Sequence, residues 1–167
     1  MKTIKIDKNE YTLEFTFEAA ECKDLVQSMF NVLSGAYLVR HANVDDENES
    51  EKMKAVVDGS SEMVADIPRI CRIAFYAGLL ENHEVSMNEA KDLMKQYMKE
   101  NKLSFYRLFE DLKEWMVDDG FFDLSGLNDM IQKMGDAVEK STQEQTEDQE
   151  ESKDAKGPNK KKSTSTK

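Results

Sequence analysis

The chain has 167 residues, enough for one domain with a substantial core, and 34% of them are charged, as is ordinary for a water-soluble protein. Its net charge of −11 disfavours non-specific binding to nucleic acid, because an acidic surface repels phosphate groups. The sequence shows neither a signal peptide nor an apolar run approaching the roughly 20 residues of a membrane-spanning helix. A cytosolic protein that does not enter the membrane is therefore expected.

Two short segments at the start of the chain alternate apolar and polar residues, which is the pattern of β-strands. The first contains Ile4 and Ile6, and the second follows the turn-rich connector 7–10. Together they predict a β-hairpin that packs on helices or on another subunit, because a lone hairpin is only marginally stable in water. The buried face of the second segment is expected to hold Tyr11, Leu13, Phe15 and Phe17.

After Phe17 the apolar residues recur every three or four positions, so the rest of the body is expected to be helical. The first helix is expected over about 18–33, and its apolar face includes Cys22. Cys71 falls on the apolar face of a later helix. Cysteines placed in this way are most often buried, free thiols, and a disulfide between the two is the alternative.

The middle of the chain carries a glycine and a proline that predict helix boundaries. The segments 52–57 and 60–65 are expected to form two short helical pieces, with the glycine between them. Pro68 then predicts a new helix that begins near Ile67, with Asp66 as its N-cap, because proline favours the first turn of a helix.

Three further helices have capping signals. Ser86 and Glu89 form a capping box, and Ser104 opens the next helix, which Gly120 closes as a left-handed residue. A last helix is expected to begin near Ser125. The predicted fold class is therefore α+β, with an N-terminal β-hairpin followed by a bundle of four to five amphipathic helices.

The segment 141–167 contains no Ile, Leu, Val, Met, Phe, Trp or Tyr. It has nothing to bury against the entropy of ordering, so it is predicted to be a disordered polar tail. Its six acids and six bases cancel, which leaves the whole charge of −11 on the body. The predicted organisation is a helical domain with its hairpin over 1–140 and a tail over 141–167.

No catalytic or metal-binding motif is recognisable in the sequence. His41 and His83 lie far apart, with no Cys or carboxylate cluster at zinc spacing, and are interpreted as surface or capping residues. The acids from Asp118 to Asp129 fit neither register of an EF-hand loop. Nucleophile elbows and phosphate-binding glycine loops are also lacking. We therefore expect a protein that is not an enzyme and takes no metal or cofactor.

Ten methionines are many for this length. On helix faces methionine most often fills a core, but its flexible thioether can also form an adaptable surface for partners of varied shape. The apolar pair directly after Gly120 favours the second interpretation slightly. On that interpretation the candidate partner-binding residues are Met94, Met98, Phe121, Phe122, Met130 and Met134.

Taken in order, four segments resemble the tail assembly chaperones of long-tailed, siphovirus-type bacteriophages that infect Gram-positive hosts. They are the opening hairpin 2–17, the helical start 18–21, the stretch 67–80 that begins Ile-Pro-Arg-Ile-Cys, and the polar, charged end. The likeness is one of pattern and order over about residues 1–140, and it identifies no individual functional residue.

The resemblance implies a non-enzymatic protein of the infected host's cytoplasm that is absent from the mature virion. Such proteins bind the tape-measure protein, keep it soluble and help recruit tail-tube subunits, and self-association is compatible with that role. The family commonly makes two products by ribosomal frameshifting, of which this chain would be the shorter. The alternative function is an acidic regulator or inhibitor of a single folded protein partner, which would carry rows of surface acids and little spare apolar surface.

Overall fold

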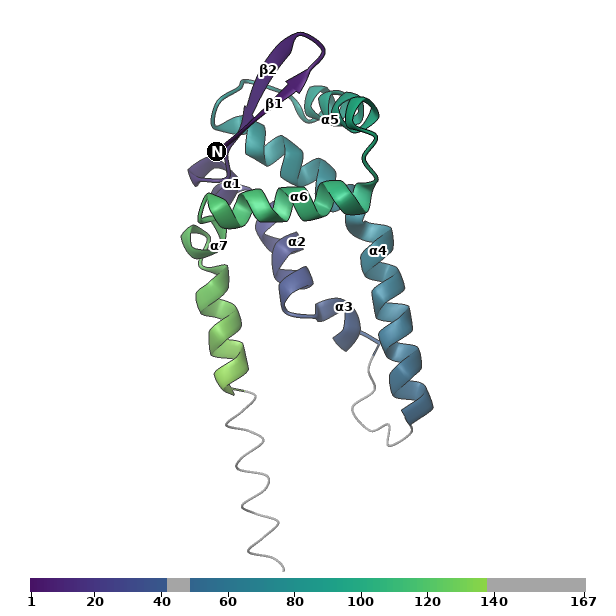
Figure 1. Cartoon of the computed structure of the whole chain (residues 1–167). Coiled ribbons are helices and arrows are strands. Elements are labelled where there is room, and N and C mark those ends of the chain that lie inside the picture. The colour runs from purple at the N-terminus through teal and green to yellow at the C-terminus, as the bar shows by residue number, and fades with distance from the viewer. Residues whose placement is uncertain (42–48, 138–167) are drawn as a thin grey trace, which may run out of the picture. The chain divides into compact units, whose positions relative to one another are not determined.

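The computed structural model describes residues 1–41 and 49–137 (Figure 1). An N-terminal β-hairpin is followed by helices, which confirms the predicted α+β fold class. The chain divides into two compact units, Met1–Asp129 and Met130–Lys167. The predicted boundary at residue 140 and the predicted tail over 141–167 lie outside the described residues.

The hairpin consists of β1 (Lys2–Ile6) and β2 (Asn9–Leu13), which pair antiparallel. Two residues connect the strands, and the first of them, Asp7, has a φ of 53°, as tight hairpin turns require. The buried side chains of the hairpin and its exit are Ile4, Ile6, Leu13 and Phe15.

Phe17 differs from the predicted buried face. Its side chain is 67% exposed, so the expectation that it is buried is wrong, and Tyr11 is only partly buried. β2 ends at Leu13, and Phe17 begins helix α1 (Phe17–Glu21). The alternation of side chains between two faces therefore stops before Phe17 is reached.

The predicted helix over 18–33 is divided into two. Cys22, with a ψ of 93°, is extended and separates α1 from α2 (Lys23–Leu33). Gly35 follows with a φ of 67° and leads into the short helix α3 (Ala36–Val39). A residue without a Cβ adopts this left-handed conformation with little strain, which explains the change of direction at this point.

The largest difference from the sequence prediction is α4 (Glu49–Leu80), a single helix where the pattern predicts three pieces. The helix continues through both Gly59 and Pro68. An internal proline costs about 3 kcal/mol, since it removes one backbone hydrogen bond and crowds the preceding turn. Apolar side chains in the following turns, including Ile70 and Phe75, offset that cost, because burying each contributes roughly 1.5–3 kcal/mol.

The capping predictions for α5 (Met87–Asn101) and α6 (Phe105–Asp118) are confirmed. The Glu89 amide donates to the Ser86 hydroxyl at 3.3 Å, and the Ser86 amide donates to the Glu89 carboxylate at 2.7 Å. The Ser104 hydroxyl accepts a backbone amide of the first turn of α6 at 3.2 Å. Because these hydrogen bonds are local, the starts of both helices can be predicted from the sequence.

Gly120 has a φ of 73°, which confirms its predicted left-handed conformation after α6. It leads into the short helix α7 (Phe121–Leu124), which begins with the apolar pair noted in the sequence. Helical backbone follows over 127–137, close to the predicted start near Ser125.

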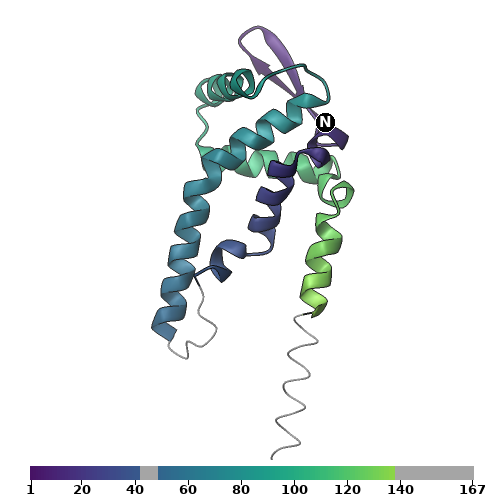
Figure 2. The same cartoon turned by 180° about the vertical axis from the view of Figure 1, so that it is seen from behind.

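The core of the first unit surrounds the second half of α4, which α6 crosses in both views, with α5 and the hairpin nearby (Figures 1 and 2). Gly78 allows the exit of the hairpin to approach this helix closely. The Glu14 amide donates to the Gly78 carbonyl at 2.7 Å, and a Cβ on Gly78 would lie 2.8 Å from Cζ of Phe15. The Phe15 amide also donates to the Asp119 carboxylate at 2.9 Å. The exit of the hairpin is thus fixed to both α4 and the end of α6.

Candidate partner-binding surface

The first half of α4 carries a row of exposed apolar side chains. Met53 is 65% exposed, Val57 is 58% exposed and Val64 is 61% exposed, and Val56 and Ser60 are exposed beside them. Their spacing of three and four residues places them on one helix face. We call this face the α4 stripe, defined as Met53, Val56, Val57, Ser60 and Val64.

No charged side chain belongs to the α4 stripe, although the rest of this half of the helix is rich in charge. Lys54, Asp58 and Glu62 fall on other faces, as their positions along a helix of 3.6 residues per turn require. The α4 stripe is therefore an uncharged, mostly apolar face on a protein with a net charge of −11. Clustered exposed apolar surface of this kind is a candidate interaction site.

The opposite face of the same half-helix packs on α3. Ala55 and Gly59 are buried there. A Cβ on Gly59 would lie 2.5 Å from the carbonyl oxygen of Tyr37 and 2.9 Å from Cα of Leu38. Only glycine permits this approach, because real Cβ atoms do not come so close to a backbone. The contact fixes which face of α4 is turned toward α3.

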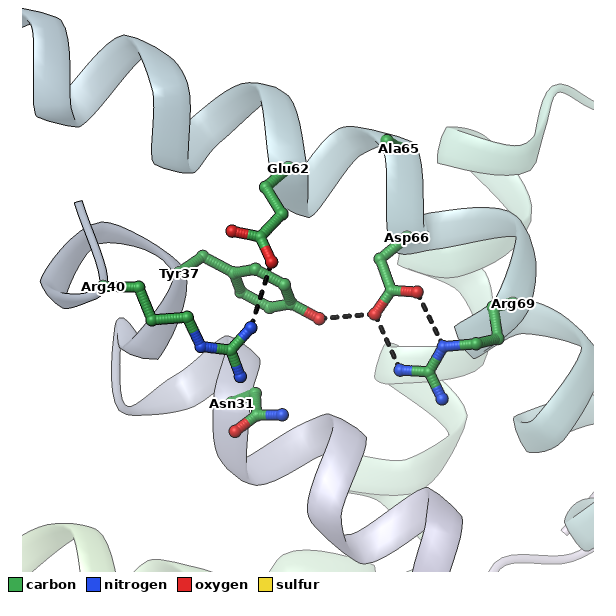
Figure 3. A pocket seen from close by; sticks show the side chains of 7 residues that line it. All are labelled: Asn31, Tyr37, Arg40, Glu62, Ala65, Asp66 and Arg69. Atoms are coloured by element: carbon green, nitrogen blue, oxygen red, sulfur yellow. Dashed lines mark hydrogen bonds and ion pairs between the residues drawn. The ribbon is translucent and has the colours of Figure 1, made fainter.

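A hydrogen-bonded cluster reinforces the same contact (Figure 3). The Tyr37 hydroxyl donates to Oδ2 of Asp66 at 2.6 Å, and Arg69 donates to both oxygens of Asp66 at 2.6 and 2.7 Å. The Arg69 hydrogen bonds, followed by that of Tyr37, lower the pKa of the Asp66 carboxyl. Burial and the neighbouring Asp66 raise the pKa of Tyr37 to about 12. Asp66 therefore lies within α4 and binds α3, and the prediction that it is an N-cap is wrong.

A second pair of contacts joins the end of α3 to α4. Arg40 donates to Glu62 at 3.0 Å, and Nε2 of His41 lies 2.9 Å from the other oxygen of Glu62. These hydrogen bonds, that of His41 foremost, lower the pKa of the Glu62 carboxyl. The guanidinium of Arg40 also lies 5.4 Å from the centre of the Tyr37 ring, within reach of a cation–π interaction.

The cluster lines an open pocket of about 330 Å³. Each guanidinium that lines it is paired with a carboxylate of α4, as the dashed lines in Figure 3 show. Among residues 1–41 and 49–137, no group of three or more His, Cys, Asp and Glu side chains is arranged to hold a metal ion. We interpret the cluster as a structural contact that holds α3 against one face of α4, while the α4 stripe lies on the other face. Its lining residues are Asn31, Tyr37, Arg40, Glu62, Ala65, Asp66 and Arg69.

The six candidate partner-binding residues fall into two groups. Met94, Phe121 and Phe122 are buried in the core, and Met98 packs partly buried against it. Met130, 55% exposed, and Met134, 44% exposed, are accessible in the helical segment 127–137. Of the six, only these last two present an apolar surface to a partner in this conformation.

Sequence reasoning missed the α4 stripe because it divided α4 at Gly59 and Pro68. The signal is nevertheless present, since the steps from Met53 to Val57, Ser60 and Val64 are four, three and four residues. That spacing is the seam of a coiled coil, and it is visible only once 49–66 is read as one helix.

Comparison of the chain with known protein families, with curated proteins and with solved structures finds no match. No helix in the described part of the chain has the length and hydropathy needed to span a bilayer.

Proposed function

We propose that the protein is a non-enzymatic tail assembly chaperone of a long-tailed bacteriophage. In this proposal it binds amphipathic helical segments of the tape-measure protein, keeps that protein soluble and helps bring tail-tube subunits to it. The observation that carries the proposal is the α4 stripe, an exposed and uncharged apolar helix face on a strongly acidic protein.

The physical argument concerns how such a surface holds a client helix. Complete burial of a Val or Met side chain contributes roughly 1.5–3 kcal/mol, so four such side chains that are half exposed contribute several kcal/mol when a helix covers them. An amphipathic helix with apolar residues at matching positions packs against a face of this kind. The negative charge of the complex then opposes aggregation, because copies of it repel one another.

The exposed Met130 and Met134 support the same role. Their flexible thioethers adapt to partners of different shape, and they lie on one helical face because they are four residues apart. The alternative, an acidic regulator of one folded protein, has less support. Such a protein needs rows of acids and little spare apolar surface, whereas the α4 stripe is apolar over several turns.

The test is co-expression with a candidate tape-measure protein, followed by measurement of soluble client and recovery of the complex. The native chain is expected to raise the soluble fraction of the client, and Val57→Asp is expected to abolish most of that effect. The matched control is Val117→Asp on α6, because Val117 is 61% exposed and lies outside the α4 stripe. Equal client solubility with and without the native chain, together with no recovered complex, would favour the single-partner regulator.

The proposal also places the protein in the cytoplasm of the infected bacterium and not in the mature virion, with a second, longer product made by ribosomal frameshifting. Peptide mass spectrometry of infected lysates and of purified particles tests this part. Peptides of the chain should occur in the lysate and be absent from particles. A frameshifted product would give peptides that join this chain to a new C-terminal sequence.

A further inference from the structure

The α4 stripe is complementary to a copy of itself. Consider two copies of α4 that lie antiparallel and are related by a two-fold axis. If this axis passes midway between residues 58 and 59, Met53 of one copy faces Val64 of the other, and Val57 of one copy faces Ser60 of the other. Each layer then joins an a-type to a d-type position, which is the geometry of an antiparallel coiled coil. A symmetric contact of this kind uses the same patch on both subunits.

Side-chain size distinguishes this arrangement from a parallel one. In a parallel pair Ser60 would face Ser60 of the other copy, which leaves a poorly filled layer and two hydroxyls in the seam. In the antiparallel pair the larger Val57 fills the space above Ser60.

Charge does not oppose the contact across the seam itself. The α4 stripe contains no charged residue, so no like charges face each other there. The two acidic bodies repel one another at longer range, with −11 on each chain. Because salt screens charges over about 10 Å at 0.1 M, added salt should strengthen the pairing.

The size of the contact indicates the class of interface to which it belongs. Two α4 stripes of this length bury about 1,000 Å² in total, which is at the low end for specific protein interfaces. The hydrophobic side chains that they cover are 48–65% exposed in the single chain. A weak, reversible dimer is therefore expected rather than an obligate one.

We infer that two copies of the chain pair through their α4 stripes, antiparallel, to form a weak two-fold dimer. The pairing does not depend on the proposed chaperone function. If that function holds, however, the second copy covers the α4 stripe until a client helix displaces it.

The first test is the concentration dependence of mass in solution, measured by sedimentation velocity at low and at high salt. The native chain should approach twice the mass of one chain as concentration rises, and more readily at high salt. Val57→Asp should remain monomeric, and Val117→Asp, equally exposed but outside the α4 stripe, should behave as the native chain. A monomeric native chain throughout, or a Val57→Asp chain that still dimerises, would overturn the inference.

The second test examines the register and does not depend on a destabilising substitution. Two variants, Met53→Cys and Val64→Cys, are made separately in a Cys22→Ser background, and one of them carries a size tag. The two proteins are then mixed and treated with a short bismaleimide, which cross-links cysteines that lie close together. Cys71 can remain, because its thiol is buried and burial raises its pKa to about 12, which leaves it unreactive. The antiparallel seam predicts that the mixed product dominates. Dominance of the two like-with-like products would overturn it.

The two proposals can fail separately. If the native chain is monomeric and Val57→Asp abolishes client capture, the chaperone proposal stands and the pairing is refuted. If the native chain dimerises through positions 53 and 64 but never captures a client, the pairing stands and the chaperone proposal is refuted.

Discussion

The two halves of α4 differ in what surrounds them, although they form one helix. The second half, from Ile67 onward, is enclosed by the hairpin, α5 and α6, and its buried side chains include Ile70 and Phe75 at 0% exposure. The first half is fastened to α3 along one face only. Its other face carries the α4 stripe, where Val57 and Val64 are 58% and 61% exposed.

This difference separates residues that are needed for folding from residues that are not. An apolar side chain in the second half is explained by the core that it fills. An apolar side chain in the α4 stripe contributes much less to the core, since about half or more of it stays in contact with water. Several of them in one uncharged row form the surface that the proposed partner would cover.

The largest expected effect is in the core that encloses the second half of α4. Phe15, which packs on Gly78, is 0% exposed, so Phe15→Asp should lower the free energy of unfolding by about 4 kcal/mol or more, through lost packing and a buried charge. Denaturant unfolding measures this. Phe17→Asp is the control, because Phe17 is 67% exposed and should tolerate the change. Similar losses for both variants would contradict the described packing of the hairpin exit.

A smaller effect is expected where the first half of α4 meets α3. Gly59→Ala should lower the free energy of unfolding by about 1–2 kcal/mol, because its Cβ would strike the Tyr37 carbonyl, a cost that exceeds the gain in helix propensity. Thermal unfolding followed by circular dichroism measures it. Gly135→Ala, which meets nothing within 4 Å, is the control and should preserve or slightly raise helicity. If both variants gained stability, the close contact between α3 and α4 would be incorrect.

The hydrogen-bonded cluster between α3 and α4 should make the stability of the protein depend on pH. The pKa of Asp66 is lower in the folded protein than in the unfolded chain, so its ion pair stabilises the fold at neutral pH and is lost as pH falls through the folded value. Asp66→Asn should therefore cost about 1 kcal/mol near neutrality, allowing for solvent screening, and progressively less below about pH 4. Unfolding midpoints across this range measure the difference.

The matched control for that experiment is Asp92→Asn. Asp92 pairs with Lys95 at 3.0 Å, but its side chain is 75% exposed, so screening by water should leave almost no change in stability. An Asp66→Asn effect that is constant with pH would show that packing, rather than the ion pair with Arg69, accounts for it.

The smallest expected effect is in the α4 stripe. Val57→Asp should change the free energy of unfolding by less than about 0.5 kcal/mol in dilute solution, because Val57 is exposed and the two residues have similar helix propensities. The equivalent change in the other half, Ile70→Asp, should lower the free energy of unfolding by about 4 kcal/mol or more, as expected for Phe15→Asp, since Ile70 is fully buried. A large loss of stability with Val57→Asp would mean that the α4 stripe is covered within a single chain.

The sequence by itself determines the features that depend on neighbouring residues. The alternation around Ile4 and Ile6 predicts the hairpin, and the capping box at Ser86 predicts the start of α5. Gly120 predicts the end of α6, because only local backbone conformation is involved. Each of these signals operates within a few residues, where propensity and side-chain-to-backbone hydrogen bonds dominate.

Only the tertiary structure decides whether a glycine or a proline ends a helix, and which apolar helix faces are covered. Pro68 lies within α4 because burial of the following turns outweighs a local penalty of about 3 kcal/mol. Met94 and Met130 have the same residue type and similar helical surroundings, yet one is 3% and the other 55% exposed. A pattern of spacing shows that a helix has an apolar face, but only the packing of distant segments determines whether that face is core or is left for a partner.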